Sequence, residues 1–231
     1  PHSGFITMGG AIRRFDNFAM KSWLETRTGL PVSVENDANC VLLAERWQGK
    51  AAEMANFLVL TIGTGIGGAI FCQHRLINGA RFRAGEFGYM LTDRPGGRDP
   101  RRYSMNENCT LRVLRHRYAQ HIGAPLDSVT GELIFDRYDA GDPVCQRLVA
   151  EFFNGLGHGL YNLVHIFDPQ TIFIGGGVVE RPGFLTLLRQ HLAWFGIADY
   201  LDTVSHGNDA GLIGAVYHFN QLYRSPDDDR H

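Results

Sequence analysis

This sequence lacks any close pair of cysteines. Its four cysteines, Cys40, Cys72, Cys109 and Cys145, are too far apart for the CxxC spacing of a metal site. It also lacks a hydrophobic run of the roughly 18 residues that a membrane helix needs, and a signal peptide. Free thiols without a signal peptide indicate a reducing compartment. We therefore expect a cytoplasmic protein with no metal site and no membrane partner.

An excess of one charge is also missing. The chain has 22 Lys and Arg residues against 24 Asp and Glu residues. Such a balance gives no electrostatic reason to bind nucleic acid or an anionic membrane. The arginines that gather at 94–117 are interpreted as a solvated loop and helix face. We therefore expect no nucleic-acid partner.

Hydrophobic residues, by contrast, make up 44% of the 231 residues, enough to bury a core. Their spacing predicts helices that alternate with strands, which is the pattern of the α/β class. The expected strands are 31–35, 56–62, 66–73 and 170–174, and the expected helices are 18–28, 40–47, 107–120, 142–166, 183–195 and 210–223. The polar stretch 92–103, rich in Gly and Pro, predicts a surface loop.

The segment 58–71 contains a G-x-G-x-x-G pattern at Gly63, Gly65 and Gly68. A dinucleotide site needs a helix after this pattern, but residues 69–72 predict a strand, which disfavours an NAD-dependent oxidoreductase. A strand, Gly-Thr-Gly and a second strand instead predict a tight hairpin. Its backbone N–H groups and the Thr64 hydroxyl could approach an anion closely, although a plain β-turn would show the same pattern.

Three further segments could carry chemistry. In Glu35-Asn36-Asp37-Ala38-Asn39, the Asn-Asp pair is either a helix cap or a carboxylate placed to take a proton from a hydroxyl. In 84–89, glycines flank an acid and an aromatic residue, which suits a loop that binds polyols. In 171–178, a strand runs into three glycines, which could pack on a nucleobase or only turn a corner.

Taken together and in this order, the four segments resemble the ROK family of repressors and sugar kinases. The resemblance extends from Gly4-Phe5-Ile6 to 208–215 and implies a two-lobed, actin- and hexokinase-like ATPase fold. It divides the chain into the remainder of an N-terminal lobe, 1–35, completed by a C-terminal helix in 208–231, and a C-terminal lobe, 36–207. The family's first phosphate loop, Asp-x-Gly-Gly-Thr, is expected upstream of Pro1, so the N-terminal part of the first lobe is expected to be missing.

The resemblance also assigns roles residue by residue. Asp37 matches the catalytic base, and the residues that match sugar ligands are Asn36, Asp37, Glu86, Tyr89 and Glu107. The residues that match nucleotide ligands are Gly63, Thr64 and Gly65 of the second phosphate loop and Gly175, Gly176 and Gly177 of the adenosine loop. The implied cofactors are ATP and Mg²⁺.

The chain departs from the family at its zinc site. Most members carry a His and a C-x-C-G-x-x-G-C cluster, but here Tyr89 stands in place of the His and Cys109 alone remains in the matching loop. We therefore expect no structural zinc. Members with this arrangement resemble the β-glucoside kinase branch, which phosphorylates the 6-hydroxyl of a glucose unit in cellobiose-type sugars.

The resemblance thus predicts an ATP-dependent sugar kinase acting on a small-molecule β-glucoside. A glucokinase or another hexose kinase of the family is the first alternative. A sugar-sensing transcriptional repressor is an alternative of another class, although the intact Asp37 and the missing zinc cluster argue against it. The resemblance also suggests a homodimer.

Overall fold

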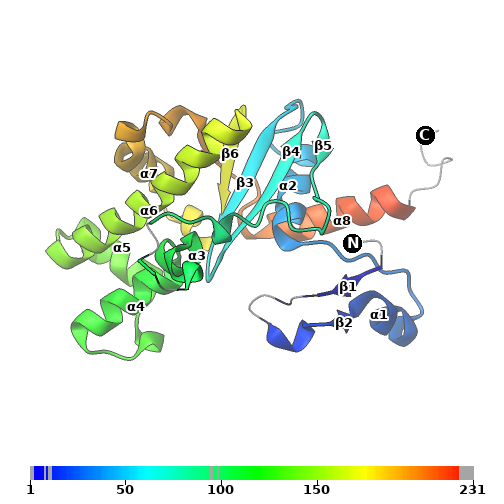
Figure 1. Cartoon of the computed structure of the whole chain (residues 1–231), viewed down its shortest axis with the longest axis horizontal. Helices are drawn as coiled ribbons and strands as arrows, with labels where there is room; N and C mark the ends of the chain where they lie inside the picture. Colours follow the sequence, from blue (N-terminus) through cyan, green and yellow to red (C-terminus); the bar gives the residue numbers. More distant parts are fainter. Residues whose placement is uncertain (1–2, 8, 10–11, 94–95, 98, 224–231) are drawn as a thin grey trace.

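A five-stranded mixed sheet with helices on both faces forms the centre of the molecule (Figure 1). The structure is a computed structural model that describes residues 3–7, 9, 12–93, 96–97 and 99–223. The α/β class is as the sequence predicts. Among the described residues, no helix has the length and hydrophobicity to cross a membrane.

The sheet has the strand order β5-β4-β3-β6-β7. Its strands are β3 (Phe57–Ile62), β4 (Ile66–Cys72), β5 (Arg75–Leu76), β6 (Thr171–Gly175) and β7 (Leu201–Thr203). β3, β4 and β5 pair antiparallel, whereas β3, β6 and β7 run parallel. The carboxyl ends of three strands therefore lie at one edge of the sheet, which is where α/β proteins usually bind ligands.

Alternation along β3 assigns one face of the sheet to each helix layer. Phe57 and Val59 pack with α2 (Asp37–Gln48) and with α8 (Ala210–Tyr223), which lie on one side of the sheet in Figure 1. Leu58, Leu60 and Ile62 belong to the larger core on the other face. That face is covered by α6 (Pro143–Phe167) and the helices around it.

The other helices of the larger layer are α3 (Met105–Asn108), α4 (Leu111–Ile122), α5 (Gly131–Asp139) and α7 (Phe184–Leu192). The side chains of Thr110, Thr130 and Asp142 accept backbone N–H bonds at the starts of α4, α5 and α6. Short 3-10 helices lie at Arg13–Phe15, Phe87–Tyr89, Pro100–Tyr103, Leu126–Ser128, Gly177–Glu180, Ala193–Phe195, Ala198–Tyr200 and Gly207–Asp209.

The N-terminal residues form a small unit beside α8 (Figure 1). β1 (Phe5–Ile6) pairs antiparallel with β2 (Phe18–Ala19), and α1 (Met20–Thr28) follows. The Tyr223 hydroxyl at the end of α8 donates to the Val32 carbonyl at 3.1 Å. α8 also contacts α2 closely, because a Cβ added at Gly214 would lie 1.7 Å from the Cys40 carbonyl oxygen. The division into lobes at 1–35 and 36–207 stays a prediction.

Three expectations need correction. Residues 31–35 form no strand; they connect α1 to α2 without pairing to another described segment. The helix expected at 18–28 begins only at Met20, after β2. The helix expected at 107–120 is two helices, α3 and α4, because Thr110 caps a new helix between them. The stretch 92–103 is a loop ending in a 3-10 helix, except for residues 94–95 and 98, which lie outside the described residues.

Candidate active site at the glycine edge of the sheet

Asn36 and Asp37 begin α2. The Asn36 Oδ1 accepts the backbone N–H of Asn39 at 3.1 Å and therefore caps the helix. The Glu35 carboxylate accepts from the Asn36 N–H at 2.8 Å and from the Asn39 amide at 2.9 Å, which fixes the approach to the helix. Asn36 is thus the cap, and Asp37 is the first helical residue.

Asp37 is exposed at the helix N-terminus, and its Oδ1 accepts the Ala38 N–H at 2.8 Å. The helix dipole stabilises a negative charge there. Ala38 lies against β4, since a Cβ added at Gly67 would lie 3.5 Å from the Ala38 Cβ. An accessible carboxylate in this position is placed to accept a proton next to the glycine hairpin.

The hairpin between β3 and β4 is as predicted. Ile62 pairs with Ile66, and the Gly63 N–H donates to the Gly65 carbonyl at 3.0 Å. Thr64 and Gly65 are exposed. On the side of the larger helix layer, the first N–H of α4, from Leu111, donates to the Gly63 carbonyl at 3.2 Å. The turn is therefore fixed by a hydrogen bond from α4, while its tip faces solvent.

Residues 84–89 pack against β4. Gly85 has φ +85°, and a Cβ there would lie 2.4 Å from the Gly68 carbonyl oxygen. A Cβ on Gly68 would lie 2.1 Å from the Phe87 ring. This close approach requires glycine on both sides and presents Glu86 and Tyr89 at the surface, where both are exposed.

Asn106, on α3, joins the hairpin to this loop, and sequence reasoning missed it. Its Oδ1 accepts the Ile66 N–H at 2.7 Å, and a Cβ added at Gly88 would lie 2.4 Å from its Nδ2. The neighbouring Glu107 is exposed and pairs with Arg112 at 3.1 Å. The only sequence signal for Asn106 is that it is a polar residue beside Glu107, at the start of a helix.

The three glycines that end and follow β6 lie next to the hairpin. Gly175 pairs with Thr61 of β3. Gly176 has φ +96°, and a Cβ there would lie 2.2 Å from the Ile62 carbonyl oxygen. The glycine loops 63–65 and 175–177 therefore adjoin at the carboxyl ends of β3 and β6, which the sequence alone could not place together.

Two glycines of these loops are not required by the fold. A Cβ added at Gly63 or Gly177 would meet no atom within 4 Å, and neither glycine has a positive φ. Nothing in the fold therefore requires glycine at these two positions, whereas a ligand that approaches the backbone would. Among the described residues, no group of three or more His, Cys, Asp and Glu side chains could hold a metal ion. The expected absence of structural zinc stays a prediction.

The chain is similar in sequence to known proteins. The profile of the ROK family matches residues 2–221. The chain is 99% identical over 231 residues to a β-glucoside kinase of Klebsiella pneumoniae, covering all of the chain and 78% of that protein. It is 59% identical over 222 residues to a β-glucoside kinase of Listeria innocua, covering 96% of the chain and 76% of that protein.

Solved structures show the same relationship. A ROK family glucokinase from Streptomyces griseus, in complex with glucose and AMPPNP, superposes with a TM-score of 0.75 at 25% identity. The match covers 88% of this chain and 72% of that one. The fold is therefore that of the actin-like ATPase kinases, and the chain belongs to the ROK family.

Proposed function

We propose that this chain carries the active site of an ATP-dependent kinase that phosphorylates the 6-hydroxyl of a glucose unit in a β-glucoside such as cellobiose. The observation that supports this most is the exposed carboxylate of Asp37 beside two adjoining glycine loops. The β-glucoside kinases of Klebsiella pneumoniae and Listeria innocua support the substrate class.

The chemistry follows from the residues. Asp37 accepts the proton of the sugar hydroxyl as the hydroxyl oxygen attacks the γ-phosphorus of ATP in line, and the bond from the γ-phosphorus to the bridging oxygen breaks to release ADP. The backbone N–H groups of 63–65 stabilise negative charge on the transferring group. Mg²⁺, when bound, neutralises charge on the β- and γ-phosphates. Residues 175–177 hold the adenosine, and Asn36, Glu86, Tyr89 and Glu107 are proposed to contact the sugar.

The 92–103 loop supports a β-glucoside over free glucose. In this chain the loop carries no cysteine, so it supplies no thiolate ligands through which a metal ion could fix its conformation. We propose that the sugar pocket lies next to this loop and, without such a metal ion, has room for a second unit at C1. The S. griseus glucokinase, which was solved with glucose, favours free glucose as the second candidate substrate.

The test is kcat/KM for cellobiose, glucose, fructose and N-acetylmannosamine with Mg²⁺ and ATP. A sulfur-linked β-glucoside should be included, because it cannot release glucose through a contaminating glycosidase. We expect cellobiose and the thioglucoside to be phosphorylated at a 6-hydroxyl. Efficient use of glucose with no use of either β-glucoside would identify a glucokinase, and preference for fructose or N-acetylmannosamine would refute the substrate class.

A further inference from the structure

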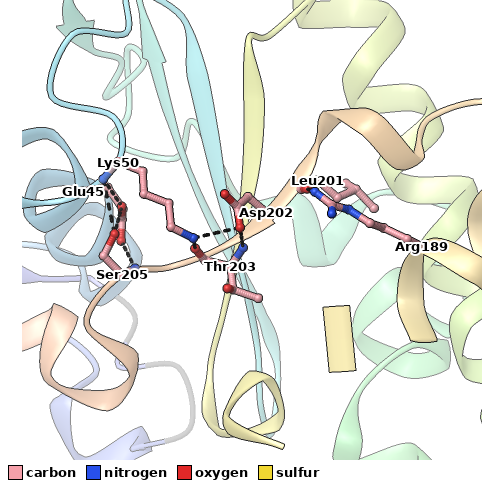
Figure 2. A network of polar contacts seen from close by, with 7 residues as sticks. All are labelled: Glu45, Lys50, Arg189, Leu201, Asp202, Thr203 and Ser205. Carbon is pink, nitrogen blue, oxygen red and sulfur yellow. Dashed lines mark hydrogen bonds and ion pairs between the residues drawn. The ribbon is translucent and has the colours of Figure 1, made fainter. Parts of the chain in front are cut away.

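Glu45 is a fully buried acid in the last turn of α2, with 0% of its surface exposed. Its carboxylate accepts bonds from the Ser205 N–H, from the Ser205 hydroxyl at 2.9 Å and from the Lys50 N–H at 3.1 Å (Figure 2). It forms no ion pair with the described part of the chain. Burial and the negative end of the helix dipole both disfavour a carboxylate here. These hydrogen bonds offset that cost.

Ser205 lies at the edge of the sheet formed by the carboxyl ends of β3, β6 and β7, where the glycine loops 63–65 and 175–177 also lie. It follows Val204, whose N–H donates to the Ile174 carbonyl of β6 at 3.0 Å. The loop 205–209 thus begins at the carboxyl end of β7, beside the glycine loops that follow β3 and β6. Glu45 therefore holds the third loop of this edge.

The loop 205–209 is also bonded to the segment that follows the adenosine loop. The Asn208 N–H donates to the Glu180 carboxylate at 3.1 Å. Glu180 ends the 3-10 helix that begins at Gly177. Through Ser205 and Asn208, the position of Glu45 is thus transmitted to the residues proposed to hold adenosine.

α2 connects the loop 205–209 to the proposed base, Asp37. Its first residue, Asp37, lies beside β4 through Ala38. Past its other end, the Lys50 Nζ bonds the Asp202 carboxylate at 2.8 Å and the Thr203 carbonyl at 3.0 Å, both on β7 (Figure 2). A helix of 12 residues spans about 18 Å. The helix therefore crosses the sheet with Asp37 and the glycine hairpin at one end and the loop 205–209 at the other.

We propose that Glu45 is a positioning residue that sets the loop 205–209, and through it the adenosine loop, relative to Asp37. This inference rests on the proposed function as an ATP-dependent kinase. Gly49 supports it, since a Cβ there would lie 2.2 Å from the Glu45 Oε2, so the turn after α2 leaves room for this carboxylate alone.

The test compares Glu45→Ala and Glu45→Gln with a control, Glu53→Ala, which removes an exposed acid just beyond α2. The readouts are the dissociation constant of Mg-ADP by calorimetry and the separate KM values for ATP and cellobiose. Glu45→Ala removes the carboxylate and its hydrogen bonds. It should weaken Mg-ADP binding about tenfold and raise the KM for ATP by a similar factor. The KM for cellobiose should stay within about twofold of wild type, because the sugar residues are not attached to this loop.

Glu45→Gln should recover most of the affinity, because its amide oxygen accepts the Ser205 N–H and its amide nitrogen can donate to the Ser205 hydroxyl. A purely structural role would lower Tm and the active fraction while leaving Mg-ADP affinity unchanged in every variant, and that result would overturn the proposal. So would an equal rise in both KM values.

If Glu45→Ala does not fold, the variant Ser205→Ala tests the positioning role instead. It removes one of the bonds to the carboxylate, and about threefold weaker Mg-ADP binding is expected, whereas unchanged affinity refutes the proposal. Calorimetry also separates the two hypotheses. A wild-type protein that phosphorylates no sugar would refute the proposed function, while the dependence of Mg-ADP affinity on Glu45 would still decide the positioning role.

Discussion

Asn36 and Asp37 are neighbours with different tasks. Asn36 caps α2 through the Asn39 N–H, and Asp37 stands exposed after it. The sequence shows that a helix starts here, but both residue types are common caps, so it cannot say which of them caps. Because Asn36 does, Asp37 can be changed without loss of the cap.

Asp37→Asn should therefore fold normally and lose phosphoryl transfer. The amide keeps the shape of the side chain but cannot accept the hydroxyl proton, and kcat should fall by at least about 10²-fold. Stability should fall only slightly, by the ~0.5 kcal/mol that a charge at a helix N-terminus contributes. A coupled assay with cellobiose measures the rate.

The matched control is Asp127→Asn, the same replacement at an exposed position in a 3-10 helix far along the chain. It should keep full activity. If Asp37→Asn retained a rate within a few-fold of wild type, Asp37 would not be the base.

Asn106 shows where prediction of single residues stops. The sequence points to Glu107 through its resemblance to an acid of the family, whereas the structure brings its neighbour Asn106 against the hairpin and the 84–89 loop. Successive residues of a helix point about 100° apart. α3 has only four residues, so no periodicity in the sequence could reveal which of its sides faces the site.

At the scale of elements, short apolar runs predicted the strands that carry the site. The β3–β4 hairpin was predictable because both strands are such runs and a glycine turn joins them. β7 was not predictable, since it has three residues and its partner β6 lies about 30 positions earlier in the chain. The 31–35 stretch alternates as a strand would, but within the described part of the chain it pairs with no other strand. Alternation gives a strand only where another strand is available to pair.

The glycines at the carboxyl edge of the sheet are of two kinds: some are required by the backbone, and others are not. Gly176 has φ +96° and would place a Cβ 2.2 Å from the Ile62 carbonyl oxygen, whereas a Cβ at Gly63 would meet no atom within 4 Å. Gly176→Ala should therefore destabilise the protein by about 1–3 kcal/mol through backbone strain. Gly63→Ala should leave the stability nearly unchanged but weaken ATP binding and lower kcat, because its methyl group occupies the space proposed for phosphate.

Urea unfolding and the KM for ATP measure the two effects. Gly211→Ala is the control, because a Cβ there also meets no atom within 4 Å and the residue lies in α8, away from the hairpin. A Gly63→Ala protein with wild-type KM and kcat would show that the hairpin does not hold phosphate.

At the scale of the whole molecule, the sequence supplied the segments, and the topology brought them together. Parallel pairing of β3, β6 and β7 places three loops at one edge, although they lie at 63–65, 175–177 and 204–209. Only the resemblance to the ROK family linked these segments beforehand, because periodicity carries no information about which strands pair. The buried contact between Glu45 and Ser205 was beyond reach for the same reason: 160 positions separate its two residues.

Buried thiols on both faces of the sheet should make the whole molecule sensitive to alkali. Burial, with a smaller contribution from Glu35 and Asp37, raises the pKa of Cys40 from 9.0 to about 12. Burial also raises the pKa of Cys109 to about 11, and it raises the pKa of Cys145. In the unfolded chain these thiols ionise at their ordinary pKa, near 9, so the unfolded state loses protons that the folded state keeps.

These thiols should therefore leave the free energy of unfolding independent of pH well below pH 9, and lower it as the pH rises from there toward 11. Each buried thiol contributes a slope of ~1.4 kcal/mol per pH unit above its unfolded pKa. Urea titrations between pH 7 and 10.5 measure this. Cys109→Ala should lower the stability at pH 7, because it opens a cavity in the core, but reduce the alkaline slope by about one proton. A slope that is the same in wild type and Cys109→Ala would mean that this thiol ionises as readily in the folded protein as in the unfolded chain.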